Sequence, residues 1–391
     1  MRIPLSAPDV REEEIELVAA VLRTPHLSLG PQLEEFERAI AEYIGTHNAI
    51  GVSSGTAGLH LCVRAMGIGA GDEVIVPSFA FVAVANVLRY EKAIPVFVDI
   101  ETNTLNLDAR RIEAAITPRT KAILVVHTFG CPAEMSMILD IARRHHLYVL
   151  EDACEAIGAQ YENQKVGSLG DAGVFGFYPN KQITTGEGGM VVTRNPRLAS
   201  IIRALRNQGR TSSDDWFQHS ELGYNYRLSE MSCALGIGQL KRIDATLSMR
   251  TEIVRKYSDR LKENRNVRLP MLALSNRTIS WFVYVVRLSE EYSQVHRDWI
   301  VQEMNCRGIG CGRYFAPIHL QPAYRGAAMR KTDLRITETE ASRCLALPLF
   351  NRLQDEQIDE VCENLCGLVR LAGELAFASA QENELTFLLD R

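Results

Sequence analysis

A lysine beside a glycine-rich turn is the first feature of this sequence that could do covalent chemistry. Lys181 follows the apolar run 173–177 and precedes the segment Thr-Thr-Gly-Glu-Gly-Gly at 184–189. Burial and nearby positive charge can lower the pKa of a lysine amine, which then attacks a carbonyl carbon to form a Schiff base. An isolated lysine more often makes a surface salt bridge, so Lys181 is a candidate that needs support from other residues.

Acidic residues follow a second apolar run. The run 147–151 ends in Glu151, and Asp152 and Glu155 come after it. A carboxylate at the end of a buried strand can hold a proton on the ring nitrogen of a ligand, and such a charge-assisted hydrogen bond contributes about 1.5–3 kcal/mol. Acids in this position also form caps or face water, so this feature alone does not identify a ligand.

Small residues follow a third apolar run, 49–52, at the start of a helical pattern. Gly55, Thr56 and Ala57 belong to this segment, which spans residues 53–59. Small side chains let the backbone approach a phosphate closely, and the free amides of a helix N-terminus bind it. A serine or threonine at a helix start is also an ordinary cap.

A fourth feature gains meaning beside these three. The polar segment 223–228 contains Asn225 and Arg227 and leads into a helix, which is equally typical of a turn and cap. A phosphate cradle, an acid for a ring nitrogen, a Schiff-base lysine and a further polar group together match the needs of pyridoxal 5'-phosphate. The sequence therefore predicts a site for this cofactor at the carboxyl ends of strands, where α/β sheets place their ligands.

The elements that must position these residues form an alternating α/β pattern between residues 46 and 195. The apolar runs are continuous, as in strands buried on both faces, and helical patterns such as 59–66 and 135–146 separate them. We expect a mainly parallel seven-stranded sheet between helices, with one antiparallel edge because a loop joins the last two runs. The expected strands are 49–52, 73–77, 94–99, 122–127, 147–151, 173–177 and 189–193.

The sequence after this pattern predicts a second domain. We expect a large cofactor-binding domain over residues 1–250 and a smaller C-terminal α+β domain over residues 251–391, without a flexible linker. The order of the tail beyond Ala372 is left open. The other expected elements are helices at 9–22 and 33–44, a long helix at 229–264, a strand at 279–288, and helices at 295–307 and 355–371.

Composition excludes several classes of function. The 391 residues are 46% hydrophobic and 23% charged with a net charge of -5, as in soluble globular proteins, and no charge run indicates nucleic acid or membrane as a partner. The first five residues lack the apolar core of a signal peptide, so a cytoplasmic location is expected. The nine cysteines include no Cys-x-x-Cys motif, which predicts reduced thiols and no metal site.

The combination of motifs resembles the DegT/DnrJ/EryC1/StrS family of sugar aminotransferases, which depend on pyridoxal phosphate. The similarity runs from Leu-Ser-Leu-Gly-Pro at 27–31, through the four motifs, to Tyr-Phe-Ala-Pro-Ile-His-Leu-Gln-Pro at 314–322 and Leu-Pro-Leu-Phe at 347–350. The lysine segment with its Thr-Thr-Gly-Glu-Gly-Gly is the most specific part. The resemblance implies a fold type I transferase that is an obligate homodimer with shared active sites.

The resemblance also implies roles for individual residues. Lys181 corresponds to the lysine that forms the Schiff base and moves the proton between donor carbon and cofactor, and Asp152 to the acid that keeps the pyridine nitrogen protonated. Other positions that match the family are the phosphate-binding Gly55, Thr56 and Ala57, the ring-stacking Phe81, Asn225 reaching the phosphate from the neighbouring subunit, and the substrate-binding candidates Arg227, Tyr314 and His319.

Two positions depart from the commonest pattern of the family. Glu155 stands near the cofactor's phenolic oxygen, where many relatives have Gln or His, and must be protonated or turned away to avoid repelling that oxygen. Gly176 stands where many relatives have a phosphate-binding serine. Backbone amides or water could supply the hydrogen-bond donor that this serine would provide.

The resemblance implies a two-stage amino transfer. An amino acid, in this family usually L-glutamate, gives its amine to the cofactor, which passes it to a nucleotide-linked keto sugar. A 4-keto-6-deoxyhexose is expected, which would give a 4-amino-4,6-dideoxy sugar; a 3-keto sugar or a keto-cyclitol is the alternative. Dehydrating members of the family carry His at the Schiff-base position, so Lys181 argues against a dehydratase.

Two other classes of enzyme and one class of binding protein are alternatives. Gly-Val-Ser-Ser-Gly at 51–55 fits the nucleophile elbow of a serine hydrolase, with Ser53 as the nucleophile, but follows the first strand and leaves Asp152 and Lys181 unexplained. An oxidoreductase that binds a dinucleotide fits the sequence less well, because no Gly-x-Gly-x-x-Gly motif follows an expected strand. A regulatory protein that binds the cofactor without catalysing a reaction is the third alternative.

Overall fold

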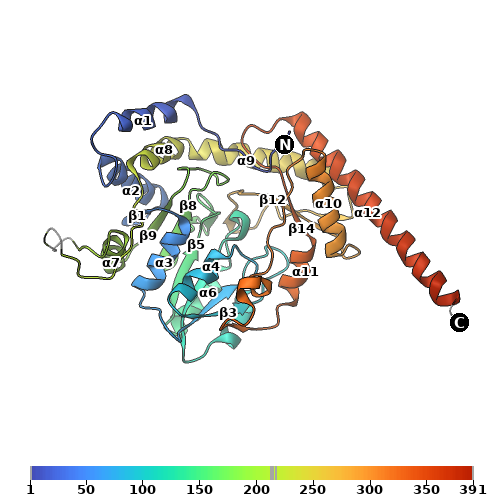
Figure 1. Cartoon of the computed structure of the whole chain (residues 1–391), viewed down its shortest axis with the longest axis horizontal. Helices are drawn as coiled ribbons and strands as arrows, with labels where there is room; N and C mark the ends of the chain where they lie inside the picture. The colour runs from blue at the N-terminus through green and yellow to red at the C-terminus, as the bar shows by residue number, and fades with distance from the viewer. Residues whose placement is uncertain (1, 212–214, 216–217, 390–391) are drawn as a thin grey trace.

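The computed structural model describes residues 2–211, 215 and 218–389, and an eight-stranded sheet lies at its centre (Figure 1). The strand order is β1-β9-β8-β5-β4-β2-β3-β13, and neighbouring strands are parallel except in the two pairs that include β9. The strands are β1 (Asn48–Val52), β2 (Glu73–Pro77), β3 (Ile94–Val98), β4 (Thr120–Val126), β5 (Tyr148–Asp152), β8 (Ala172–Gly176), β9 (Gly189–Thr193) and β13 (Arg330–Lys331).

The seven strands predicted from the sequence are present, but the prediction of an antiparallel edge was wrong. β9 lies inside the sheet, because β1 pairs with one side of it and β8 with the other. The loop after β8 lets the chain return antiparallel, as expected, yet only the long-range pairing with β1 decides which strand forms the edge. The eighth strand is a two-residue segment, Arg330 and Lys331, from the C-terminal part of the chain, and it pairs with β3.

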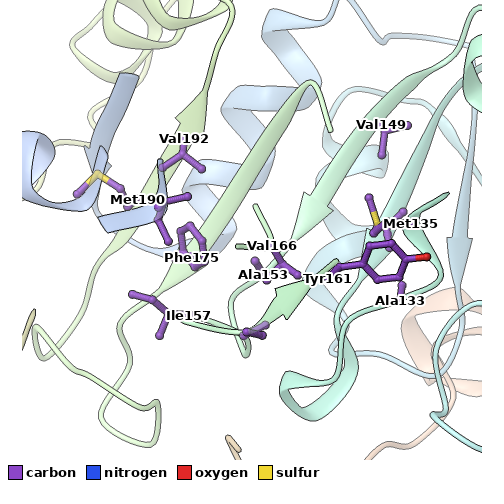
Figure 2. Packing of buried hydrophobic residues seen from close by; sticks show 14 of the residues in the cluster. Ala133, Met135, Val149, Ala153, Ile157, Tyr161, Val166, Phe175, Met190 and Val192 are labelled. Atoms are coloured by element: carbon purple, nitrogen blue, oxygen red, sulfur yellow. The ribbon is translucent and has the colours of Figure 1, made fainter. Parts of the chain in front are cut away.

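Helices cover both faces of the sheet, as strands that are apolar on both sides require (Figure 1). The first group of helices, on one face, is α3 (Gly55–Ala65), α4 (Ala83–Tyr90) and α7 (Pro196–Arg206); the second, on the other face, is α2 (Pro31–Ile44), α5 (Ala109–Ile112), α6 (Met135–Arg144) and α8 (Glu230–Lys241). Successive strand residues face opposite layers, so Leu150 packs with the first group and Val149 with the second. Figure 2 shows Phe175, Met190 and Val192 in the layer of the second group.

The long helix predicted at 229–264 is two helices. α8 ends at Lys241 and α9 (Ile243–Leu261) begins after Arg242, whose backbone leaves the helical region at φ -117°. The guanidinium of Arg242 donates to Asp9 Oδ2 at 2.9 Å and to Glu14 Oε1 at 2.6 Å, the latter in α1 (Glu12–Leu22). These bonds to the N-terminal segment fix the break, and a continuous helical pattern in the local sequence cannot reveal them.

The C-terminal part of the chain surrounds a second, smaller sheet. β12 (Tyr284–Leu288) pairs antiparallel with β10 (Val267–Arg268) and β14 (Cys344–Leu347). The strand expected at 279–288 is shorter, because the carbonyls of Trp281 and Phe282 accept hydrogen bonds from Arg250 instead of a neighbouring strand. The helices here are α10 (Gln294–Cys306), α11 (Arg335–Arg343) and α12 (Asp355–Leu389); β6 (Gln160–Tyr161), β7 (Gln164–Lys165) and β11 (Arg277–Thr278) form a third sheet.

Helix α12 continues well past residue 371, where the sequence pattern predicted its end, and projects from the body of the molecule (Figure 1). The domain boundary near residue 250 stays a prediction; it falls within α9, and Ile3 packs with the apolar residues of the C-terminal part. No helix in the described ranges has both the length and the apolar character needed to cross a bilayer.

Candidate active site

Three of the predicted motifs meet at the carboxyl ends of the parallel strands. β1 leads into the small-residue segment at the start of α3, β5 ends in Asp152, and β8 ends in Gly176. A Cβ atom built on Gly55 would stand 2.6 Å from Cys154 Sγ, and one on Gly176 would stand 3.2 Å from Cys154 Cβ. The structure therefore places the helix start, the acid motif and the end of β8 in direct contact.

The start of α3 has the form of an anion site. Ser54 caps the helix by accepting a hydrogen bond from the Ala57 N–H at 3.0 Å. A Cβ on Gly189 would lie 2.7 Å from the Gly55 nitrogen, so glycine lets β9 begin against this turn. The first amides of α3 lie beside residues 152–154, and free amides at a helix N-terminus suit a phosphate group.

Asp152 is buried with unused acceptor capacity. Its Oδ1 accepts the Cys154 N–H at 3.0 Å, and within the described chain this is the one backbone amide that bonds its carboxylate. Burial raises the pKa of Asp152, while Cys154, Lys181 and His127 lower it. A protonated ring nitrogen would supply the opposite charge that this buried carboxylate favours, so the residue fits the acid required by a pyridine ring.

Lys181 lies between an acid and an aromatic ring. Its Nζ is 3.5 Å from Glu155 Oε1 and 3.9 Å from the centre of the Phe282 ring, and its side chain is only 14% exposed. Phe282 comes from the C-terminal part of the chain and was not predicted as a site residue. Because Phe282 lies in the strand expected at 279–288, an apolar side chain there is ordinary. The sequence therefore contained no sign that Phe282 contacts Lys181.

Glu155 faces the lysine and is not turned away from it. Its Oε2 accepts the Phe129 N–H at 3.0 Å, and Gln182 Nε2 donates to its main-chain carbonyl at 2.6 Å. Burial raises the pKa of Glu155, whereas Lys181 lowers it. The Lys181 amine and the Phe129 N–H thus lie against the two oxygens of the Glu155 carboxyl group.

Tyr314 lies in the same polar group. Burial raises the pKa of its hydroxyl, and the Glu155 carboxylate raises it further, while the neighbouring Asn180 amide lowers it. Asn180 Oδ1 is itself buried and without a hydrogen-bond partner. The structure thus brings Tyr314, a predicted substrate residue, close to Glu155 and to the residue before Lys181.

Three other predicted residues lie on two loops, one after β2 and one before α8. The Phe81 side chain is 61% exposed on the loop after β2, and Asn225 is exposed as well. Arg227 donates to Asn207 Oδ1 at 2.8 Å, and the Tyr226 carbonyl accepts the Ser53 N–H at 2.9 Å, so this loop adjoins the end of β1. Their contacts with a cofactor or with a neighbouring subunit stay predictions.

His319 is held by two protein side chains. Its Nδ1 lies 2.7 Å from Ser78 Oγ and its Nε2 lies 3.0 Å from Glu338 Oε1, with the side chain 1% exposed. Burial lowers its pKa. Both ring nitrogens already have protein partners, so the geometry gives no support to a role for His319 in substrate binding.

Ser53 lacks the partner that a hydrolase nucleophile needs. His60, the histidine of the following helix, pairs with Tyr226 and Glu91. Within the described residues no histidine bonds Ser53, and no group of three or more His, Cys, Asp or Glu side chains is arranged to hold a metal ion.

The charge of Glu155 gives a test of this geometry in the cofactor-free protein. Burial raises its pKa, so its contribution to stability is full below the unfolded-state pKa, about 4.3, and is lost as the pH rises through the folded-state pKa. Glu155→Gln cannot ionise yet still accepts the Phe129 N–H. Urea unfolding from about pH 5 to about pH 8 should show a smaller loss of stability in the variant, by about 1 kcal/mol.

The control for this experiment is Glu16→Gln, which changes an exposed glutamate on α1. It should follow the wild-type pH profile. A profile of Glu155→Gln that coincides with the wild-type profile would contradict the buried, proton-favouring environment of Glu155.

Comparisons with known proteins show the family of the chain. The model of the DegT/DnrJ/EryC1/StrS aminotransferase family matches residues 8–366. GDP-perosamine synthase of Caulobacter vibrioides is 43% identical over 363 residues, which cover 92% of this chain and 96% of that protein. The spore coat polysaccharide biosynthesis protein SpsC of Bacillus subtilis is 36% identical over 379 residues, which cover 94% and 97%.

The fold is also that of a solved relative. The putative sugar aminotransferase Spr1654 of Streptococcus pneumoniae, in its PLP form, superposes with a TM-score of 0.90 at 27% identity over 95% of this chain and all of that one. The α/β sheet is therefore the sheet of fold type I sugar aminotransferases, and the chain belongs to the DegT/DnrJ/EryC1/StrS family of aminotransferases.

Proposed function

We propose that this chain transfers an amino group from L-glutamate to a nucleotide-linked 4-keto-6-deoxyhexose and so makes a 4-amino-4,6-dideoxy sugar. The observation that carries the proposal is the placement of Lys181. Its amine lies buried between Glu155 and Phe282 at the edge of the sheet where Asp152 and the start of α3 also lie.

Bound pyridoxal 5'-phosphate would supply a carbonyl carbon for the lysine and a ring that withdraws electrons. The α3 amides around Gly55, Thr56 and Ala57 would bind its phosphate. Asp152 would hold the proton on the ring nitrogen, and Lys181 Nζ would move the proton at the donor carbon. Phe81 would cover the ring, at about 0.5–1.5 kcal/mol beyond the area it buries.

The sugar and its nucleotide are inferred from similarity. GDP-perosamine synthase is 43% identical to this chain over nearly all of both proteins, which favours a GDP-linked sugar with its ketone at C4. Tyr314 and Asn180 offer hydrogen-bonding groups next to Lys181 for the hydroxyls of that sugar. A 3-keto sugar or a keto-cyclitol is the alternative substrate, and Lys181 argues against dehydration.

We also propose a cytoplasmic homodimer with shared sites. Asn225 and Phe81 are exposed in the single chain, although the family resemblance assigns both to the cofactor. A second subunit that brings its Asn225 to this site would explain the exposure of the residue. Arg227, on the same loop, would then lie near the partner's substrate.

The test is a panel of nucleotide keto sugars. Purified protein with cofactor and L-glutamate should release 2-oxoglutarate and convert GDP-4-keto-6-deoxymannose into the amine, read by product mass, with 3-keto sugars as the comparison. Release of 2-oxoglutarate without any amino sugar would overturn the substrate, and a dehydrated product would overturn the reaction. Absence of keto acid release, both from glutamate and from other amino acids, would overturn the transfer itself.

A further inference from the structure

A fully buried histidine and glutamate lie directly behind the Asp152 end of the sheet. His127 follows β4, Glu151 precedes Asp152 in β5, and neither side chain is exposed. His127 Nε2 is 3.0 Å from Glu151 Oε2. Because successive strand residues face opposite sides, Glu151 points away from the α3 side that Asp152 faces.

Glu151 is tightly held by hydrogen bonds. Besides the bond from His127, its oxygens accept three backbone N–H groups, from Gly167 at 2.7 Å, Leu169 at 2.8 Å and Gly170 at 2.6 Å. All four partners donate, which an ionised carboxylate can satisfy and an amide cannot. The charge of Glu151 is thus stabilised locally, and its position is fixed by the turn 167–170.

His127 links the fixed Glu151 carboxylate to the turn 127–133. Its Nδ1 accepts the Ala133 N–H at 3.1 Å, so the ring proton is on Nε2 and is donated to Glu151. Its main-chain N–H donates to the Asp152 carbonyl at 3.1 Å. His127 therefore closes the turn 127–133 and ties its first residue to the end of β5.

The turn 127–133 in turn holds a residue of the active site. Its Phe129 N–H donates to Glu155 Oε2 at 3.0 Å, and Glu155 Oε1 faces Lys181 Nζ at 3.5 Å. Asn106 supports the same turn by accepting the Thr128 N–H at 2.9 Å. A chain of contacts thus runs from Glu151 through His127 and Phe129 to Glu155 and the lysine.

We infer that His127 and Glu151 are positioning residues for the cofactor site, which set the placement of Asp152 and of Glu155 without touching the reacting atoms. This inference rests on the proposed cofactor function. Loss of the His127 ring frees the Ala133 N–H and the Glu151 carboxylate, and we expect the turn that carries the Phe129 N–H, and with it Glu155, to shift relative to Lys181.

Two variants separate the pair from a simple role in stability. His127→Leu removes both ring bonds, whereas His127→Gln places a donor where Nε2 lies and keeps the bond to Glu151. We expect His127→Leu to raise the dissociation constant of pyridoxal 5'-phosphate about tenfold and to move the pH midpoint of the absorbance of the Lys181-bound cofactor. His127→Gln should recover part of both changes.

The matched control is Glu73→Gln at the opposite end of the sheet. Glu73 is also buried and accepts bonds from Thr117, Arg119 and Arg330, but it lies at the amino end of β2. The Glu73→Gln substitution should lower the melting temperature and leave the cofactor affinity and the absorbance midpoint unchanged.

A double-mutant cycle shows whether His127 acts through Glu155. In a Glu155→Ala background, His127→Leu should weaken cofactor binding by less than about threefold, because the contact it controls is already gone. Full additivity would overturn the inference. So would a His127→Leu variant that melts earlier but binds the cofactor with wild-type affinity and midpoint.

A second measurement keeps the inference testable if His127→Leu does not fold. Amide hydrogen exchange of the cofactor-loaded protein should be faster at Phe129 and Ala133 in His127→Gln than in wild type, since the Ala133 N–H loses its acceptor. Unchanged exchange would overturn the inference. These readouts need cofactor binding but no sugar, so a wrong sugar leaves them intact, and a wild type that binds no cofactor points to failure of the proposed function instead.

Discussion

Lys181→Ala is expected to abolish both the absorbance of the lysine-bound cofactor and the half-reaction with L-glutamate. The variant loses the amine that attaches the cofactor and the group that moves the proton, so the rate should fall by at least about 10,000-fold. Stopped-flow absorbance after mixing with glutamate measures the rate, and a spectrum of the resting protein measures attachment.

The control is Lys165→Ala, another partly buried lysine. Lys165 Nζ lies 3.5 Å from the centre of the Tyr43 ring and so also contacts an aromatic side chain. Among the described residues, it makes no contact with Asp152 or Glu155. It should keep the absorbance and the half-reaction. An intact glutamate half-reaction in Lys181→Ala would refute the assignment of the lysine.

Asp152→Asn should reduce both half-reactions about 100- to 1,000-fold while the protein stays folded. The asparagine oxygen can still accept the Cys154 N–H, so the turn at 152–154 keeps its shape. The charge that would hold a proton on the ring nitrogen is lost, and loss of one partner from a buried charge pair costs about 3–5 kcal/mol. Rapid-mixing kinetics with glutamate and with the keto sugar measure the two stages separately.

Asp171→Asn is the matched control for this prediction. Asp171 precedes β8 at the opposite end of the sheet, its Oδ2 accepts the Val149 N–H at 2.8 Å, and burial raises its pKa as it does for Asp152. Comparable kinetic losses in the two variants would show that a partly buried aspartate at the other end of the sheet matters equally, and would remove the special role of Asp152.

Local patterns predicted the fold, and which residues gather at the carboxyl edge of the sheet, because both depend on neighbours in the chain. The continuous apolar runs located seven strands, and the residues after them had to lie at one edge of a parallel sheet. Asp152 and Gly55 are therefore close to each other for reasons visible in their own segments. Lys181 could be placed for the same reason, since it follows β8 at that edge.

Contacts between distant segments could not be predicted in this way. Phe282 reaches Lys181 from the C-terminal part of the chain, where Arg250 donates hydrogen bonds to the carbonyls of residues 281 and 282. The partners of His319, Ser78 and Glu338, lie 241 and 19 residues away in the chain, and the family motif gave no sign that they occupy both ring nitrogens. Such contacts are set by the packed chain as a whole.

The two-residue strand β13 bears on the solubility of the protein. Without it β3 would be an outer strand whose free backbone groups can recruit a strand of another molecule, which is a common start of aggregation. At the other edge, Arg206 of α7 donates to the Gly51 carbonyl of β1 at 2.9 Å and Arg203 to Ala49 at 3.2 Å. Both margins of the sheet are thus shielded, and a chain shortened ahead of residue 330 would expose one of them.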